Sequence, residues 1–248
     1  MQKSNLVYNA ITPKMQICFM QRGGQFMHVD EKELLRFQKA ADINEIEMMF
    51  GRYVTLMDQM DAMSIYYELF AIDHPDVSIE YETCGTYCGP EHVKAFMEDF
   101  AAKLSDWHTK RGWLDFHDAG TPQVVLSKDH QRAQAMWTLF SPKAKPATSN
   151  ASFSGQRTLT AFWQAGKMHW ELIHTPEGWK ILSLHQLTYF TTEYHTGWVK
   201  QQECYREPPF WAMKPDKKAR FYVYHPDQVY VQNGQYDWGP YLPEDESF

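Results

Sequence analysis

The stretch Phe50–Asp61 reads FGRYVTLMDQMD and closes a run of apolar residues that recur every three or four positions. The members of this run are Ile46, Met49, Phe50, Tyr53, Val54 and Met57. Their spacing predicts an amphipathic helix with one apolar face. Asp58 follows Tyr53 by five positions, which is about 140° around an ideal helix. The two side chains can therefore share a pocket only if the helix ends or bends near Met57.

The expected start of this helix is Asp42, because a Glu follows it three residues later and completes a capping-box pattern. Residues 31–40 also have helical composition. At the other end, Asp58 is a candidate for the residue that ends the helix, and Asp61 is an equally good capping candidate.

Two more helices and several strands follow, and together they predict an α+β fold. The helices are expected at residues 62–70 and from Glu91 to Phe100. The strands are expected at residues 77–81, 114–126, 133–140, 157–173 and 179–190. Helices first and long antiparallel strands after them indicate a curved antiparallel sheet with the helices packed on one face. Residues 141–155 are rich in turn-forming residues and predict an insertion between two strands.

The chain is organised in three segments. Residues 1–40 are expected to form an N-terminal arm, residues 41–200 the α+β domain, and residues 201–248 a C-terminal tail rich in Pro, Tyr and Trp. Aromatic side chains in such numbers rarely stay solvated. We therefore expect the tail to pack on its own domain or on a neighbouring subunit.

Composition narrows the possible partners. The net charge is −7, and no basic cluster exceeds Lys217-Lys218, so no nucleic-acid partner is expected. No apolar run reaches the roughly 20 residues that span a bilayer, and no signal peptide is visible, so we expect no membrane partner and a cytoplasmic location. The chain has 9 Trp, 14 Tyr and 15 Phe, which favours an aromatic-lined pocket or a large subunit interface.

Cysteine spacing gives little reason to expect a metal. Cys84 and Cys88 form a Cys-x3-Cys pair with only His92 nearby. A zinc site needs further ligands at close spacing. We therefore expect reduced thiols, no metal and no cofactor.

Four short motifs follow one another along the chain. They are Gly51-Arg52-Tyr53-x4-Asp58, Leu69-Phe70-Ala71, Cys88-Gly89-Pro90-Glu91-His92-Val93 and Glu177-Gly178-Trp179-Lys180-Ile181. Their order and spacing resemble the SnoaL-like domain of the nuclear-transport-factor-two-like superfamily. The resemblance covers roughly residues 41–200. It implies a cystatin-like α+β barrel, a cone of curved sheet in which the helices enclose one pocket.

Within that family, the pattern is most similar to that of the bile-acid dehydratases. This resemblance implies that Tyr53 and Asp58 on the helix, Tyr81 on the first strand and His117 before a Thr-Pro step are catalytic. A further aspartate of those enzymes would fall near Ser141. This departure leaves the substrate and the reaction open.

The chemistry of these residue types suits proton transfer in an apolar cone. A His–Asp pair can remove a proton next to a carbonyl or assist the loss of a hydroxyl, with Asp58 orienting His117 and stabilising its cation. Tyr53 and Tyr81 could donate hydrogen bonds to an oxygen that gains negative charge.

Trp137, Trp170 and His185 are the expected substrate-binding residues. Several of these candidates have core packing as a simpler alternative role, since a tyrosine on an apolar helix face or a tryptophan on a strand is more often part of the core. Strand parity alone does not tell which face of the sheet His185 occupies.

The predicted function is that of a cofactor-independent lyase of the dehydratase type. Its substrate would be a hydrophobic, ring-containing small molecule, and the chain is expected to form a homodimer or homotrimer. Two alternatives remain open. One is a C–C bond lyase (aldol or formaldehyde-releasing type) or an isomerase that uses the same pocket. The other is a protein without catalysis, which binds a hydrophobic ligand or serves in assembly.

Overall fold

The computed structural model describes residues 18–20, 26–28, 30–81, 84–108, 114–146, 159–200 and 214–218. The chain divides into two units, Met1–Asp42 and Ile43–Phe248. In the first unit, β1 (Cys18–Met20) pairs antiparallel with β2 (Phe26–His28), and α1 begins at Glu31. Most of the expected arm and tail lies outside the described residues, so the three-segment organisation stays a prediction.

Helix α1 (Glu31–Asp58) begins earlier than the sequence pattern predicts. Its capping box is formed by Asp30 and Glu33. The Glu33 amide donates to Asp30 Oδ1 at 2.7 Å, and the Asp30 amide donates to Glu33 Oε2 at 3.4 Å. The predicted start at Asp42 is wrong, because good helix formers at residues 38–41 precede it and the helix already runs through them.

The C-terminal end of α1 is closed by a Schellman motif around Met60. The Met60 amide donates to the Met57 carbonyl at 2.9 Å, and the Asp61 amide donates to the Leu56 carbonyl, also at 2.9 Å. Met60 has a φ of 60°, in the left-handed region that usually takes glycine. The helix therefore ends at Asp58 and the chain then reverses.

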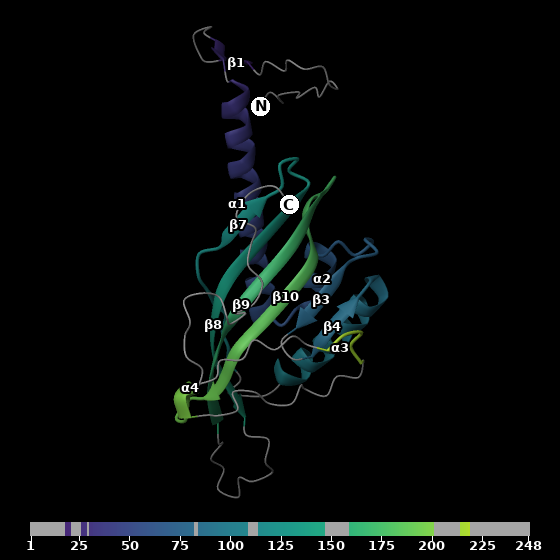
Figure 1. Cartoon of the computed structure of the whole chain (residues 1–248). Coiled ribbons are helices and arrows are strands. Elements are labelled where there is room, and N and C mark those ends of the chain that lie inside the picture. The colour runs from purple at the N-terminus through teal and green to yellow at the C-terminus, as the bar shows by residue number, and fades with distance from the viewer. Residues whose placement is uncertain are drawn as a thin grey trace, which may run out of the picture. The chain divides into compact units, whose positions relative to one another are not determined.

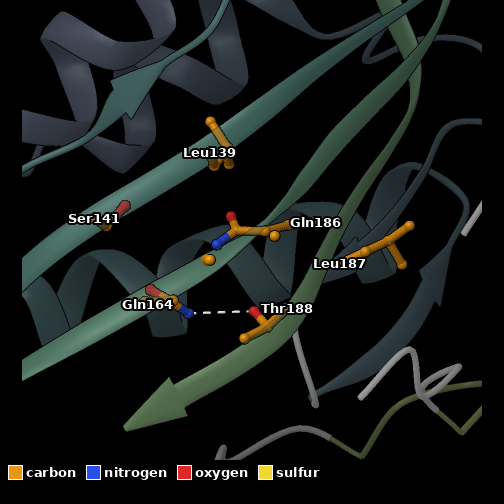
Figure 2. A pocket seen from close by; sticks show the side chains of 8 residues that line it. Leu139, Ser141, Gln164, Gln186, Leu187 and Thr188 are labelled. Atoms are coloured by element: carbon orange, nitrogen blue, oxygen red, sulfur yellow. Dashed lines mark hydrogen bonds between the residues drawn. The ribbon is translucent and has the colours of Figure 1, made fainter. Parts of the chain in front are cut away.

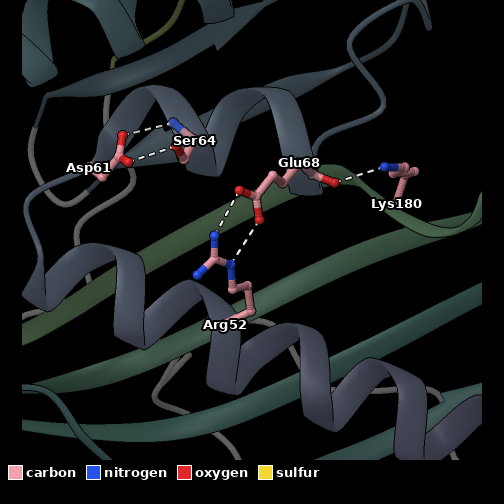
Figure 3. Close-up of polar contacts among 5 residues, drawn as sticks. All are labelled: Arg52, Asp61, Ser64, Glu68 and Lys180. Atoms are coloured by element: carbon pink, nitrogen blue, oxygen red, sulfur yellow. Dashed lines mark hydrogen bonds and ion pairs between the residues drawn. The ribbon is translucent and has the colours of Figure 1, made fainter.

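Helix α2 (Ala62–Leu69) starts directly after this turn, and Asp61 is its N-cap. The Asp61 carboxylate accepts hydrogen bonds from the Ser64 amide at 3.0 Å and from the Ser64 hydroxyl at 2.7 Å (Figure 3). These hydrogen bonds, chiefly that of the hydroxyl, hold the pKa of Asp61 below its ordinary value. Asp61 is therefore a capping residue, but of the following helix α2, whereas α1 ends at Asp58.

An ion pair joins α1 to α2 beside this turn (Figure 3). Arg52 donates two hydrogen bonds of 2.8 Å to the Glu68 carboxylate, and Lys180 Nζ donates to the Glu68 carbonyl at 2.7 Å. Arg52 lowers the pKa of Glu68 through the same contact. Two helices and a strand are therefore connected around the end of α1.

A curved, eight-stranded sheet lies in the second unit. Its strands are β3 (Ser78–Tyr81), β4 (Gly85–Cys88), β5 (Leu114–Asp115), β6 (Asp118–Ala119), β7 (Gln123–Leu126), β8 (Arg132–Pro146), β9 (Leu159–Thr175) and β10 (Gly178–Glu193). The order is β4-β3-β10-β9-β8-β5, with β6 and β7 also paired to β8. The long strands β8, β9 and β10 are antiparallel neighbours (Figure 1), whereas β3 pairs parallel with β10. The α+β class is confirmed, and the parallel pair makes the sheet mixed.

The core lies between this sheet and its helices. Its buried side chains come from α1, α2, α3 (Pro90–His108) and the strands, and they include Phe50, Leu56, Ile65, Phe96, Trp137, Trp170 and Leu184. A short helix, α4 (Gly197–Lys200), follows β10. Among the helices of the described residues, none is long and apolar enough to cross a bilayer.

Strand β8 continues into residues 141–146, which the sequence pattern assigns to a turn-rich insertion. That part of the prediction is wrong. Through these residues β8 pairs with β9, and its Lys143 and Ala144 also pair with β5. Long-range partners on both sides thus override the local turn propensity. Residues 147–155, the rest of the predicted insertion, lie outside the described residues.

Residues 214–218 are the described part of the predicted tail, and they lie along β4. The Thr86 amide donates to the Lys217 carbonyl at 2.9 Å, and the Cys88 amide donates to Asp216 Oδ2 at 2.8 Å. Asp216 also lies 2.8 Å from His92 Nδ1, a contact that lowers the pKa of Asp216. This short segment therefore covers the free edge of β4.

Candidate active site

The candidate site begins with a contact between Asp58 and His117. Asp58 is the last residue of α1, and His117 lies in the connection between β5 and β6. Its Nδ1 is 3.0 Å from Asp58 Oδ1. The His117 side chain is only 8% exposed, whereas that of Asp58 is 40% exposed. The structure thus brings together two of the four predicted catalytic residues.

The position of Asp58 is unfavourable for the helix alone. A carboxylate in the last turn of a helix faces the negative end of the macrodipole, and α1 has no basic residue in that turn. A positively charged His117 would offset both the charge of the Asp58 carboxylate and the negative end of the helix dipole. A residue placed against the local preference in this way is typical of a functional site.

Asp115 and Lys143 extend the contact into a charged network. Asp115 Oδ1 lies 3.7 Å from His117 Nε2, on the opposite side of the ring from Asp58. Lys143 Nζ is 3.1 Å from Asp115 Oδ1 and donates a 3.4 Å hydrogen bond to Oδ2. Within the described residues Oδ1 is buried and accepts no hydrogen bond. His117 is therefore flanked by two carboxylates, one of which is compensated by a lysine.

Sequence reasoning missed Asp115 and Lys143. The residue two positions before His117 shares its face of an extended strand, so Asp115 could have been found by parity. Lys143 could not, because it was assigned to the insertion. Its link to the site depends on the cross-strand pair Asp115↔Lys143.

A small polar pocket lies on the same face of β8. Ser141 is two residues from Lys143 and Leu139 is two residues further back, so the three side chains share one face. The pocket has a volume of about 10 Å³ and is lined by Leu139, Ser141, Gln164, Ala165, Gly166, Gln186, Leu187 and Thr188. Figure 2 shows these side chains on neighbouring strands, with Gln164 donating to the Thr188 hydroxyl at 3.2 Å.

Gly166 allows the strands to approach closely at this pocket. A Cβ at this position would overlap the backbone carbonyl of Leu187 on β10. Ser141, Gln164 and Gln186 are all nearly buried. The pocket floor therefore offers hydroxyl and amide groups from three adjacent strands and carries no charge of its own.

Tyr53 and Tyr81, the other two predicted catalytic residues, line a different cavity. This second cavity also has a volume of about 10 Å³, and its lining is otherwise apolar: Met57, Ile65, Phe70, Ile79, Phe96, Met97, Phe100 and Leu184. Asp58 is still helical, so it stays about 140° around the helix from Tyr53. The four predicted residues are thus divided into two pairs, and the lining of neither cavity includes Asp58 or His117.

The three predicted substrate-binding residues lie in the core or in another network. Trp137 stacks on Phe50 with ring centroids 4.0 Å apart, and Trp170 meets Tyr53 edge-on at 5.5 Å. His185 lies between Glu80 Oε2 at 3.2 Å and the Ser183 hydroxyl at 2.8 Å. None of the three lines either cavity. Their role toward a substrate stays a prediction.

Metal ligands are not grouped in the described part of the chain. There, no three His, Cys, Asp or Glu side chains are arranged to hold an ion.

Comparison with known families identifies the fold. Residues 38–185 match the SnoaL-like domain. The chain belongs to this family. The match does not extend to the narrower resemblance to bile-acid dehydratases, which remains without support. No curated protein matches the SnoaL-like chain.

Solved structures resemble the chain only distantly. The Kfla4162 protein from Kribbella flavida is 18% identical, with a TM-score of 0.47, over 63% of this chain and 97% of its own. An NTF2-like protein with a cystatin-like fold from Novosphingobium aromaticivorans is 19% identical, with a TM-score of 0.41, over 63% and 88%. Hexachlorocyclohexane dehydrochlorinase LinA-type3 from Novosphingobium barchaimii is 15% identical, with a TM-score of 0.44, over 65% and 93%. At such values no activity carries over to this chain.

Proposed function

We propose that this SnoaL-like protein is a cofactor-independent lyase of the dehydratase type, acting on a hydrophobic, ring-containing small molecule. The observation that carries the proposal is the placement of His117 between Asp58, at 3.0 Å, and Asp115, at 3.7 Å. A nearly buried imidazole between two carboxylates is suited to move a proton in both directions.

The two ring nitrogens of His117 have different tasks. Asp58 accepts the Nδ1 proton and so leaves Nε2 with its lone pair in the neutral ring. Nε2 can then take a proton from a substrate. Asp115 Oδ1 lies too far from Nε2 to hydrogen-bond to it at rest. It is close enough to stabilise the imidazolium once that has formed.

The reaction is an elimination in which protons and electrons balance. Nε2 removes a proton from a ring carbon, and the electron pair of the C–H bond forms the new double bond. The neighbouring C–O bond breaks, and the hydroxide leaves with the proton that His117 returns. The products are an unsaturated ring and water. Proton transfer of this kind contributes on the order of 10²–10⁴-fold to a rate.

Burial supports an apolar substrate. The side chains of His117, Asp115 and Lys143 are only 8%, 12% and 11% exposed, so their charges act in a poorly solvated space. A pocket of about 10 Å³ holds little more than one water molecule. Binding of a ring therefore requires the lining side chains to move apart.

Turnover of a panel of hydroxylated ring ketones tests this proposal, with mass spectrometry to detect loss of one water. We expect His117→Ala to reduce turnover about 10²–10⁴-fold and Asp58→Asn to reduce it less, with the fold intact by circular dichroism. His195→Ala, an exposed histidine after β10, is the matched control. Full turnover by both site variants would refute the proposal.

Product analysis in the same assay separates the alternatives. A C–C bond lyase would release a small carbonyl fragment, and an isomerase would leave the mass unchanged. A protein without catalysis would bind members of the panel and convert none.

A further inference from the structure

Lys143 is a nearly buried cation that faces the candidate site. Its side chain is 11% exposed, and it pairs with Asp115, which is 12% exposed. An ammonium group has three N–H donors and can serve more than one oxygen. Burying a lysine is costly unless the charge is used or compensated. Here the Asp115 carboxylate contributes to this compensation.

Strand register places Lys143 and Ser141 beside His117. Asp115 pairs with Lys143 and Ala119 with Leu139, so His117, midway between them, lies opposite Ser141. Ser141 is 3% exposed and lines the polar pocket (Figure 2). A buried hydroxyl and a buried ammonium thus flank the proton-transfer residue on one face of one strand.

We propose that Lys143 and Ser141 bind a substrate carbonyl oxygen and stabilise it as an enolate, so that the substrate is a ring ketone with its leaving hydroxyl β to the carbonyl. This inference rests on the proposed function and adds a catalytic residue, Lys143, to it. The tyrosines that the sequence pattern suggests for this task line the other cavity.

The carbonyl divides the elimination into two balanced steps. His117 Nε2 removes the proton from the carbon next to the carbonyl, and the electron pair moves onto the carbonyl oxygen. The N–H of Lys143 and the O–H of Ser141 hold this oxygen while it is negative. The electron pair then returns, the C–O bond at the β carbon breaks, and His117 gives its proton to the leaving hydroxide. Preorganised donors aimed at such an oxygen are often the largest single contribution to a rate.

A phenol tests this site without any turnover, because a phenolate resembles an enolate in charge and shape. The probe is 4-nitrophenol, whose ionised form absorbs visible light. An opposite charge within a few ångströms lowers the pKa of a bound acid by about one to three. We therefore expect the wild-type chain to bind the probe as phenolate at a pH where the free probe is largely neutral.

Variants separate this role from a purely structural pair. Lys143→Met should abolish the shift in the probe's ionisation, Lys143→Arg should retain much of it, and Ser141→Ala should weaken it. The double variant Asp115→Asn/Lys143→Met removes both charges, so it should fold without an unpaired carboxylate and also lack the shift. Lys167→Met on the opposite face of β9 is the control.

Two results would overturn the inference. One is a wild-type chain that leaves the probe neutral or does not bind it. The other is a folded double variant that ionises the probe as the wild type does. In either case, loss of turnover in His117→Ala would still support the lyase proposal, so the two claims fail separately.

Discussion

The inner face of the sheet has two regions that differ in chemistry although both are buried. Along β8, Ala135, Trp137 and Leu139 are apolar, and Ser141 and Lys143 follow on the same face. A similar change occurs on β9, from Trp170 and Met168 to Gln164, and on β10, from Leu184 to Gln186. We call the first the apolar region and the second the polar region. Stability depends mainly on the apolar region, and chemistry on the polar one.

The apolar region should show the largest effect on stability. Trp170 is fully buried and contacts the rings of Phe50, Tyr53 and Trp137. Trp170→Ala should lower the free energy of unfolding by about 3–5 kcal/mol, measured by urea denaturation. His117→Ala in the polar region should cost much less. Equal losses in the two variants would remove the distinction between the regions.

The turn after α1 positions Asp58 for the polar region. Asp61, the N-cap of α2 in this turn, should make a smaller and pH-dependent contribution to the free energy of unfolding. Asp61→Ala should lower the free energy of unfolding by about 0.5–2 kcal/mol at neutral pH. Hydrogen bonds from Ser64 lower the pKa of Asp61 in the folded chain. The stabilisation is therefore fully present above the carboxyl's unfolded pKa, about 3.9, and is lost as pH falls through the lower folded value.

Urea denaturation of both chains between pH 7 and pH 3 measures this dependence. The difference between the wild type and Asp61→Ala should become smaller toward the acid end. A difference that stays constant over the range would show that the carboxylate does not act as the cap. Asp61→Asn should behave as an intermediate, since asparagine can also cap a helix.

Replacing Met60 should have the smallest effect on stability, and this change should stabilise the fold where the others destabilise it. A side chain at a φ of 60° is strained, by about 1–2 kcal/mol, and glycine relieves the strain but adds entropy to the unfolded chain. Met60→Gly should thus raise the melting temperature slightly, as thermal unfolding would show. A lower melting temperature would mean that the Met60 side chain contributes packing that outweighs the strain.

The sequence was informative where the pattern is local or matches a family. The apolar spacing from Ile46 to Met57 predicted α1, and the family motifs paired Asp58 with His117 across fifty-nine positions. The division of Tyr53 from Asp58 was also foreseeable from helical geometry, because it needs only the 3.6-residue period.

Long-range pairing accounts for what was missed. Two prolines near Lys143 suggested a turn, and only the partners β5 and β9 keep those residues in a strand. Asp42 completed a capping pattern as good as that of Asp30, yet the helix begins at the earlier one. Nothing local distinguishes two such boxes when helix formers lie between them.

The central claim is that Asp58 holds the Nδ1 proton of His117 and leaves Nε2 available for proton transfer. Nitrogen-15 NMR of the histidine rings measures this directly in the whole chain, with His117→Ala as the variant that assigns the resonance and Asp58→Asn as the test. The structure predicts that neutral His117 is protonated on Nδ1 and bare on Nε2, and that Asp58→Asn disturbs this preference. A neutral His117 protonated on Nε2, or one whose tautomer ignores Asp58, would contradict it.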